Sequence, residues 1–253
     1  MSQEKILEAR RILITGGAGG LAIPAVLEFL KQGAKVVVLD RDPEKIAALT
    51  QSTIGFEEAL TIRTVDLSDS EELHQVVTEL IEEGGAFDTL INNAAIYPSK
   101  PFLEYSLEEY QLIQKINVES AVICTQLILP GMKSLNFGRI VNITSITFSG
   151  GWENLSAYVA SKGTLIGLAR TWAREFGAFG VTVNCVAPGA FPTDAEKIHP
   201  DLKSYTERII NSQAIKRRGA AEDIVNALLF FISSNSGFIT GQTLNVDGGW
   251  VMQ

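Results

Sequence analysis

The sequence predicts an α/β fold, a doubly wound parallel sheet of about seven strands flanked by helices. Short runs rich in β-branched residues alternate with amphipathic segments along most of the chain, which is typical of βαβ units. A glycine-rich turn joins the first of these runs to the first amphipathic segment. The chain has 253 residues, of which 46% are hydrophobic, so it can bury one substantial core. No repeat or linker divides the sequence, and residues 1–253 are therefore expected to form a single domain.

Seven segments have the composition of strands, and six have the pattern of helices. The expected strands are Arg11–Thr15, Lys35–Asp40, Leu60–Val65, Thr89–Asn92, Gly138–Thr144, Val181–Val186 and Thr243–Val246. The expected helices are Leu21–Gln32, Pro43–Thr50, Ser70–Glu83, Leu107–Lys133, Ala157–Phe179 and Ala221–Ser233. The third strand is more polar than a strand buried on both faces, so we expect it at an edge of the sheet. Right-handed crossovers then limit the topology to a doubly wound sheet.

One long segment, from Pro188 to about Gly219, interrupts the alternation of strands and helices. Long insertions in compact domains tend to be lids or binding loops. Ligands of open α/β sheets bind at the carboxyl ends of the strands, which is where this segment begins. We therefore expect a substrate lid over about residues 190–218, within a catalytic and substrate half of about 136–253. A cofactor half of about 10–135 precedes it.

Composition and charge argue against several classes of function. A net charge of −8 argues against binding to nucleic acid, and no block of basic residues suggests a membrane surface. Met1–Arg10 is charged and lacks the apolar stretch of a secretory signal, and no unbroken run approaches the ~18 apolar residues that span a bilayer. Cys124 and Cys185 have no metal-ligand spacing and are expected in the core. We expect a soluble, cytoplasmic protein with no metal site.

The strongest chemical signal is a tyrosine and a lysine four residues apart, Tyr158 and Lys162, with Ser145 upstream at the end of a predicted strand. Residues four apart on a helix share one face. An ammonium beside a phenol favours the phenolate, which lowers the pKa of the phenol from about 10 and makes it a usable general base. Such a pair also arises by chance on surface helices, so its meaning depends on the residues around it.

A cofactor site is predicted by the turn Thr15–Ala22, which follows the first strand and opens the first helix. Glycines allow a pyrophosphate to approach the backbone, and a helix N-terminus favours its negative charge. Asp40 ends the second strand, where a carboxylate can accept hydrogen bonds from a ribose and repel a 2′-phosphate. This favours NAD over NADP, although Arg41 could instead bind that phosphate.

Two further strand ends add polar groups to the predicted cofactor site. Asp66 follows the third strand and is positioned to meet an adenine edge, although it could equally cap the next helix, as could Ser68 or Asp69. Asn92–Ala95 ends the fourth strand with two amides and two small residues, which leave room for a flat ligand near the backbone.

Together these motifs resemble the short-chain dehydrogenase/reductase family over essentially the whole chain, which implies a Rossmann-type fold. The family's T-G-x-x-x-G-x-G turn is matched by Thr15, Gly16 and Gly20, with Ala22 in place of the third glycine. Its N-N-A-G motif is similar to Asn92–Ala95. Because the third glycine allows close helix–strand packing, Ala22 is expected to displace the first helix slightly and loosen cofactor binding.

The resemblance also assigns a catalytic tetrad, which is Asn117, Ser145, Tyr158 and Lys162. In the implied reaction Tyr158 exchanges a proton with the substrate oxygen, Ser145 holds that oxygen, Lys162 lowers the tyrosine pKa and binds the nicotinamide ribose, and Asn117 holds a water of a proton relay. The residues expected to hold NAD are Gly16, Gly19, Gly20, Leu21, Asp40, Arg41, Asp66, Leu67, Asn93, Ala94, Tyr158, Lys162, Pro188, Gly189 and Thr193.

Substrate contacts are expected from Ser145, Tyr158, Ile96 and Trp152, and Lys100, Glu153 or His199 could each bind a polar substituent. The implied reaction is hydride transfer between NAD(H) and a secondary alcohol or ketone, of aryl, cyclic or sugar type. A 3-oxoacyl thioester is an alternative substrate.

Other activities remain open at this point. They are a redox sensor that binds NAD without turnover, and an epimerase or dehydratase that recycles its nicotinamide. Pairing of the two long helices across an axis, with Ile239–Gly249 as a further contact, implies a homotetramer or homodimer.

Overall fold

The computed structural model describes residues 5–193, 196 and 201–252, which form seven parallel strands in one sheet. The strand order is β3-β2-β1-β4-β5-β6-β7, the doubly wound arrangement that the sequence predicts. The strands are β1 (Arg11–Thr15), β2 (Lys35–Asp40), β3 (Leu60–Thr64), β4 (Thr89–Asn92), β5 (Gly138–Ile143), β6 (Val181–Pro188) and β7 (Thr243–Val246). As expected, the polar strand β3 lies at an edge.

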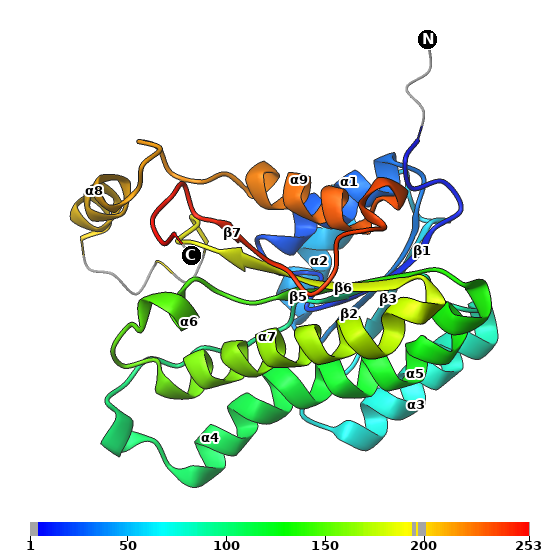
Figure 1. Ribbon diagram of the computed structural model, residues 1–253, viewed down its shortest axis with the longest axis horizontal. Helices are drawn as coiled ribbons and strands as arrows, with labels where there is room; N and C mark the ends of the chain where they lie inside the picture. The colour runs from blue at the N-terminus through cyan, green and yellow to red at the C-terminus, as the bar shows by residue number, and fades with distance from the viewer. Residues whose placement is uncertain (1–4, 194–195, 197–200, 253) are drawn as a thin grey trace.

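Helices cover both faces of the sheet (Figure 1). On one face lie α1 (Ala22–Lys31), α2 (Pro43–Ser52) and α9 (Ala221–Ile232), whose buried side chains share a core cluster. On the other face lie α3 (Ser70–Gly84), α5 (Ser120–Leu135) and α7 (Ser156–Phe176). The remaining helices are α4 (Leu107–Gln114), α6 (Thr147–Gly150), α8 (Leu202–Ser212) and the 3-10 turns Phe102–Glu104, Gly177–Phe179 and Ser234–Ser236.

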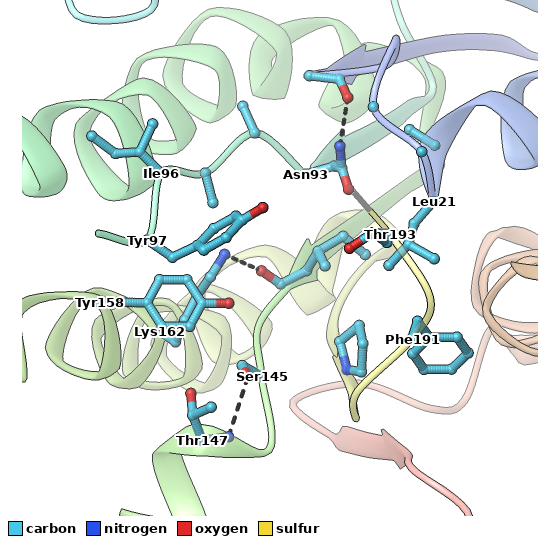
Figure 2. A pocket seen from close by; sticks show the side chains of 18 of the residues that line it. Leu21, Asn93, Ile96, Tyr97, Ser145, Thr147, Tyr158, Lys162, Phe191 and Thr193 are labelled. Atoms are coloured by element: carbon cyan, nitrogen blue, oxygen red, sulfur yellow. Dashed lines mark hydrogen bonds between the residues drawn. The ribbon is translucent and has the colours of Figure 1, made fainter. Parts of the chain in front are cut away.

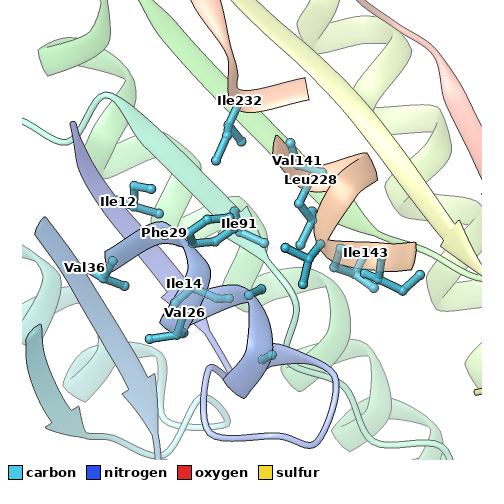
Figure 3. Close-up of a cluster of buried hydrophobic side chains, with 14 of the residues drawn as sticks. Ile12, Ile14, Val26, Phe29, Val36, Ile91, Val141, Ile143, Leu228 and Ile232 are labelled. Atoms are coloured by element: carbon cyan, nitrogen blue, oxygen red, sulfur yellow. The ribbon is translucent and has the colours of Figure 1, made fainter. Parts of the chain in front are cut away.

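The two cores follow from the alternation of side chains along each strand. Ile12 and Ile14 of β1 face the cluster that contains Phe29 of α1 and Leu228 of α9, as Figure 3 shows. Leu13, between them, belongs to the opposite cluster. Each central strand is therefore apolar on both faces, and this explains its continuous hydrophobic sequence.

Aspartates fix the starts of the helices that follow β2 and β3. Asp42 accepts hydrogen bonds from the backbone N–H groups of Glu44 and Lys45 and caps α2. Asp69 caps α3 in the same way. Of the three candidate caps for α3, Asp69 takes the role, which leaves Asp66 for other contacts.

The predicted helix Leu107–Lys133 is interrupted in the structure. A π-helical turn, Lys115–Glu119, separates α4 from α5, and α5 continues to Leu135. The buried Asn117 lies in this turn. Hydrophobic periodicity does not reveal a π turn, because one extra residue shifts the pattern without ending it.

One helical stretch of the described chain, Leu107–Leu135, is long and apolar enough to cross a membrane by length and composition. It contains charged residues, so it is not an unbroken apolar run. In the structure its α5 part packs against the sheet and α3, with Cys124 and Ile128 fully buried. A core helix of this kind meets the same criterion as a membrane span.

Candidate active site

A cavity of about 700 Å³ opens at the carboxyl ends of the strands. All the residues predicted to hold cofactor or substrate line this cavity. Asn117 of the predicted tetrad does not line the cavity, and neither do Lys100 and Glu153, which were considered for a polar substituent. The cavity reaches from the glycine turn and Asp40 at one end to Trp152, Tyr205 and Trp250 at the other.

The glycine turn is shaped so that the backbone forms part of the cavity wall. Gly16 has a φ of +62°, and a Cβ built there would lie 2.8 Å from the Cα of Ala94, so no side chain fits. The Asn93 amide donates to the carbonyls of Thr15 and Gly16 at 3.1 and 2.8 Å, which ties the turn to the end of β4 (Figure 2). A Cβ on Gly20 would meet nothing within 4 Å, because Gly20 faces open space.

The first helix begins beside this turn. Ala22, in place of a third glycine, is 3% exposed and starts α1, which carries no side-chain cap. A dinucleotide fits this end of the cavity: Gly16 leaves the backbone bare, and the uncapped start of α1 is suited to a pyrophosphate. The predicted small displacement of α1 by Ala22 stays a prediction.

Asp40 and Arg41 also line the end of the cavity that contains the glycine turn. The Asp40 carboxylate accepts from the N–H of Ala18 at 3.0 Å and from that of Arg41 at 2.8 Å. The Arg41 guanidinium pairs with Asp66 at 2.7 Å. The hydrogen bond from Ser68 N–H, and then the pairing with Arg41, lower the pKa of Asp66. Arg41 is therefore engaged by a carboxylate, and the adenine role of Asp66 stays a prediction.

At the centre of the cavity, Ser145, Tyr158 and Lys162 converge from β5 and α7 (Figure 2). Lys162 is 1% exposed, and its ammonium donates to the carbonyl of Ile143 at 2.7 Å and lies 5.4 Å from the centre of the Tyr158 ring. The Tyr97 ring packs edge-on against Tyr158, with ring centres 5.9 Å apart. The phenol is thus held between a second ring and a buried cation.

The pKa of Tyr158 differs from the expectation drawn from the sequence. Burial raises the pKa of this phenol to about 12, and a hydrogen bond with Ser145 offsets part of the increase. Burial also lowers the pKa of Lys162 to about 8. The prediction that Lys162 brings the tyrosine pKa below 10 is therefore wrong for the protein alone, because removal from water disfavours both charged forms. In this state the tyrosine is ready to donate a proton.

Asn117 acts behind the cavity wall. Its carbonyl oxygen accepts from Ile96 N–H at 2.8 Å, and its amide donates to Ile96 C=O at 2.9 Å and to Ser161 Oγ at 3.0 Å. Ser161 in turn donates to the Tyr158 carbonyl at 2.6 Å. Asn117 therefore ties the loop after β4 to the turn of α7 that carries the tyrosine. Its predicted hold on a water stays a prediction.

An aromatic wall closes the other end of the cavity. Trp152 and Trp250 meet edge to face with ring centres 5.3 Å apart. A Cβ on Gly150 would lie 1.8 Å from the Trp152 ring, so this indole lies directly on the glycine. Phe191 lies on Gly219 in a similar way, where a Cβ would come within 2.5 Å. These aromatic side chains are therefore positioned before any ligand binds.

Phe191, Tyr205 and Arg208 line this end and fall within the predicted lid of about 190–218, although none was named individually, whereas Trp250 lies outside every predicted substrate region. Of the polar candidates proposed instead, Lys100 pairs with Glu109 at 2.6 Å. Glu153 is exposed and does not line the cavity, and His199 lies outside the described residues.

The helix α8 lies within the lid segment (Figure 1). Arg218, just before α9, donates to Thr206 Oγ1 of α8 at 3.1 Å and to the Ala190 carbonyl at 3.2 Å, and it pairs with Glu196. This one side chain therefore joins α8 to both ends of the lid.

Comparison with known proteins gives a consistent result. The family model described as "Enoyl-(Acyl carrier protein) reductase" matches residues 16–251. The (2S)-[(R)-hydroxy(phenyl)methyl]succinyl-CoA dehydrogenase subunit BbsD of Thauera aromatica is 32% identical, over 96% of this chain and 97% of that protein. The 3alpha-hydroxysteroid dehydrogenase of Mediterraneibacter gnavus is 33% identical, over 96% and 97%.

Solved structures agree with this fold over nearly the whole chain. Levodione reductase has a TM-score of 0.88 and 27% identity, covering 96% of this chain and 97% of that one. The structure of ElxO with NADP bound also has a TM-score of 0.88, with 29% identity, 96% of this chain and 99% of that one.

Proposed function

This chain belongs to the short-chain dehydrogenase/reductase family of nicotinamide-dependent oxidoreductases, and from that premise we propose that it interconverts a secondary alcohol and its ketone with NAD(H). The observation that carries the proposal is the convergence of Tyr158, Ser145 and the buried Lys162 on one cavity next to a glycine turn. A redox sensor would not need a proton-transferring tyrosine at this point.

In the direction of oxidation, the substrate hydroxyl lies between Ser145 and Tyr158. Tyr158, in its phenolate form, takes the hydroxyl proton, the carbinol C–H bond breaks and a C=O bond forms. A nicotinamide held beside Lys162 would supply the hydride acceptor, so that the two electrons of the C–H bond would leave with the hydride while the hydroxyl proton passes to Tyr158. Ser145 hydrogen-bonds the reacting oxygen and stabilises the charge that develops on it. Lys162, buried beside the ring, supports the phenolate while it exists.

The aromatic wall supports a substrate that carries a ring. Trp152, Trp250 and Tyr97 present flat apolar surfaces to the cavity. Relatives are named for phenyl-bearing and steroid substrates, which are of the same kind. The 3-oxoacyl thioester alternative rests on other relatives, such as the FabG of Thermotoga maritima.

We place the reaction in the cytoplasm.

The test is a panel of aryl, cyclic, polyol and acyl thioester alcohols, each assayed for NADH formation by the purified protein. Net NADH with a ring-bearing alcohol supports the proposal. Cofactor binding without turnover across the whole panel would favour a sensor. Conversion of a substrate without net NADH would favour an epimerase or dehydratase.

Asp40 is expected to select NAD over NADP, because its carboxylate would repel a 2′-phosphate. For Asp40→Ser we expect the NADP-to-NAD ratio of kcat/KM to rise roughly 100-fold, since like-charge juxtaposition costs several kcal/mol. Steady-state kinetics with both cofactors measure the ratio. Glu44→Gln, an exposed charge change outside the cavity lining, is the matched control. A wild-type preference for NADP would contradict the assignment and point to Arg41.

We also propose a homodimer or homotetramer. On α4 and the segment before it, Leu103, Leu107 and Leu112 are exposed, and near β7 Phe238 and Leu244 are exposed as well. Leu107 and Leu112 lie on a predicted pairing helix and Leu244 lies in the predicted contact Ile239–Gly249, while Leu103 and Phe238 are just outside these elements. Light scattering at micromolar concentration is expected to give two or four times the chain mass, and a monomeric mass would overturn the proposal.

A further inference from the structure

One face of α8 carries a charge into the cavity. Tyr205 and Arg208, three residues apart, both line it, as expected for side chains on one side of a helix. The helix is well anchored, because Asp201 caps its first turn, Ile209 is fully buried and Arg218 holds Thr206. The fold therefore fixes the backbone of Arg208 beside the cavity, while its side chain is exposed to solvent.

Among the described residues, the Arg208 guanidinium has no carboxylate partner and donates no hydrogen bond, unlike the other cations of the lining. Each of the others is engaged: Arg41 by Asp66, Lys45 by Asp42 and Lys162 by the Ile143 carbonyl. The guanidinium of Arg208 lies 5.3 Å from the centre of the Tyr205 ring, and this contact does not neutralise it.

The acidic group on this side of the cavity is already compensated. Glu196 lines the cavity, but its carboxylate pairs with Arg218, and both side chains are mostly buried. Among the described residues, no carboxylate therefore compensates the positive charge of Arg208 at this end of the cavity. The chain as a whole carries a net charge of −8, so this local sign is opposite to that of the protein.

We propose that Arg208 binds an anionic group of the substrate, so that the substrate class is a ring-bearing hydroxy acid or its oxo acid. This rests on the proposed function, since the same cavity holds the reacting carbinol. The ring lies against Trp152 and Trp250, while the carboxylate, or the phosphate of a coenzyme thioester, pairs with the guanidinium. Arginine suits both groups because its planar fork can donate two hydrogen bonds at once.

Binding is tested without turnover, so that the result does not depend on the proposed reaction. The protein with saturating NAD is titrated with benzoate and with benzamide, and binding is followed by tryptophan fluorescence. Wild type is expected to prefer benzoate. Arg208→Gln is expected to raise the Kd of benzoate about tenfold, the order of a charge-assisted hydrogen bond, and to leave that of benzamide within twofold. Arg208→Lys is expected to recover part of the loss.

Lys203→Gln is the matched control, because it removes the same charge from the same helix at an exposed position outside the lining. It is expected to leave the Kd of benzoate unchanged. Equal loss in both variants would mean a general field effect and would overturn the proposal. A raised Kd for NAD in Arg208→Gln would also overturn it, because the arginine would then serve the cofactor.

A kinetic arm separates the two sources of the anion. Oxidation of 3-hydroxy-3-phenylpropanoate, its methyl ester, its pantetheine thioester and its coenzyme A thioester is compared in wild type and Arg208→Gln. A loss of kcat/KM confined to the free acid assigns the carboxylate, and one confined to the coenzyme A thioester assigns its phosphates. Turnover of all four with no effect of the variant refutes the inference while the proposed function stands. Benzoate selectivity without any turnover refutes the proposed function alone.

Discussion

Replacing Tyr158 with phenylalanine is expected to lower kcat by roughly 10²–10⁴-fold, the usual contribution of a positioned acid or base. The phenol of Tyr158 lines the cavity and hydrogen-bonds with Ser145, so it can exchange a proton with a carbinol held there. The variant keeps the ring that packs against Tyr97, so the fold and the NAD affinity should be retained. Single-turnover assays with a ring-bearing alcohol measure the effect.

Tyr97→Phe is the matched control for this change. It removes a hydroxyl from the neighbouring ring, 5.9 Å away between centres, and is expected to change kcat by no more than a few-fold. A Tyr158→Phe protein that kept most of its turnover would contradict the assignment of the proton-transferring group.

The pH dependence of the oxidation and reduction rates is a second test of the role of Tyr158. Burial raises the pKa of Tyr158 to about 12, so below that pH the phenol is mostly protonated in the protein alone. Reduction uses the protonated form and oxidation the deprotonated form. Oxidation by wild type should therefore become faster as pH rises from 6 to 10, while reduction should not. Tyr158→Phe should lose this dependence.

Lys162→Met is expected to abolish most of the activity while making the fold at least as stable at pH 7. Burial lowers the pKa of Lys162 from 10.5 in the unfolded chain to about 8. Below pH 8 the folded protein carries a buried charge that water would solvate better, and a shift of this size corresponds to about 3 kcal/mol. Methionine fills a similar volume without that charge, although the carbonyl of Ile143 then loses its donor.

The sign of the effect can be checked by varying pH. Between about pH 8 and 10.5 the unfolded state holds one more proton on Lys162 than the folded state does, so wild-type stability should rise with pH in that window. Lys162→Met should lack this rise. Denaturant unfolding of both proteins at pH 7 and pH 10 gives the difference, and a variant destabilised equally at both values would show that the lysine is a structural support.

The sequence was sufficient for the parts of the fold that depend on local pattern. The buried strands end within one or two residues of the predicted bounds, because side chains buried on both faces leave a continuous apolar run. The lid helix α8 was missed, although Leu202, Tyr205 and Ile209 follow a helical spacing after the cap Asp201. Mixed charge in that segment obscured the pattern.

The site was predictable where one motif carries the chemistry, as at Tyr158 and Lys162. The geometry of the site was not predictable where it depends on tertiary contacts. Nothing in the sequence around Trp250 indicates that its ring meets Trp152, since the two segments come together only through the sheet. The pKa of Tyr158 was misjudged for the same reason: the spacing reveals the neighbouring cation but not the depth of burial.

The π-helical turn at Lys115–Glu119 makes the length of this segment more important than most of its individual side chains. Each residue of an α-helix advances by about 100°, so one deleted residue would join α4 and α5 into a regular rod. Asn117 would then rotate away from Ile96 and Ser161, and the coupling between two walls of the site would be lost. Divergent relatives can therefore exchange amino acids here far more easily than they can gain or lose a position.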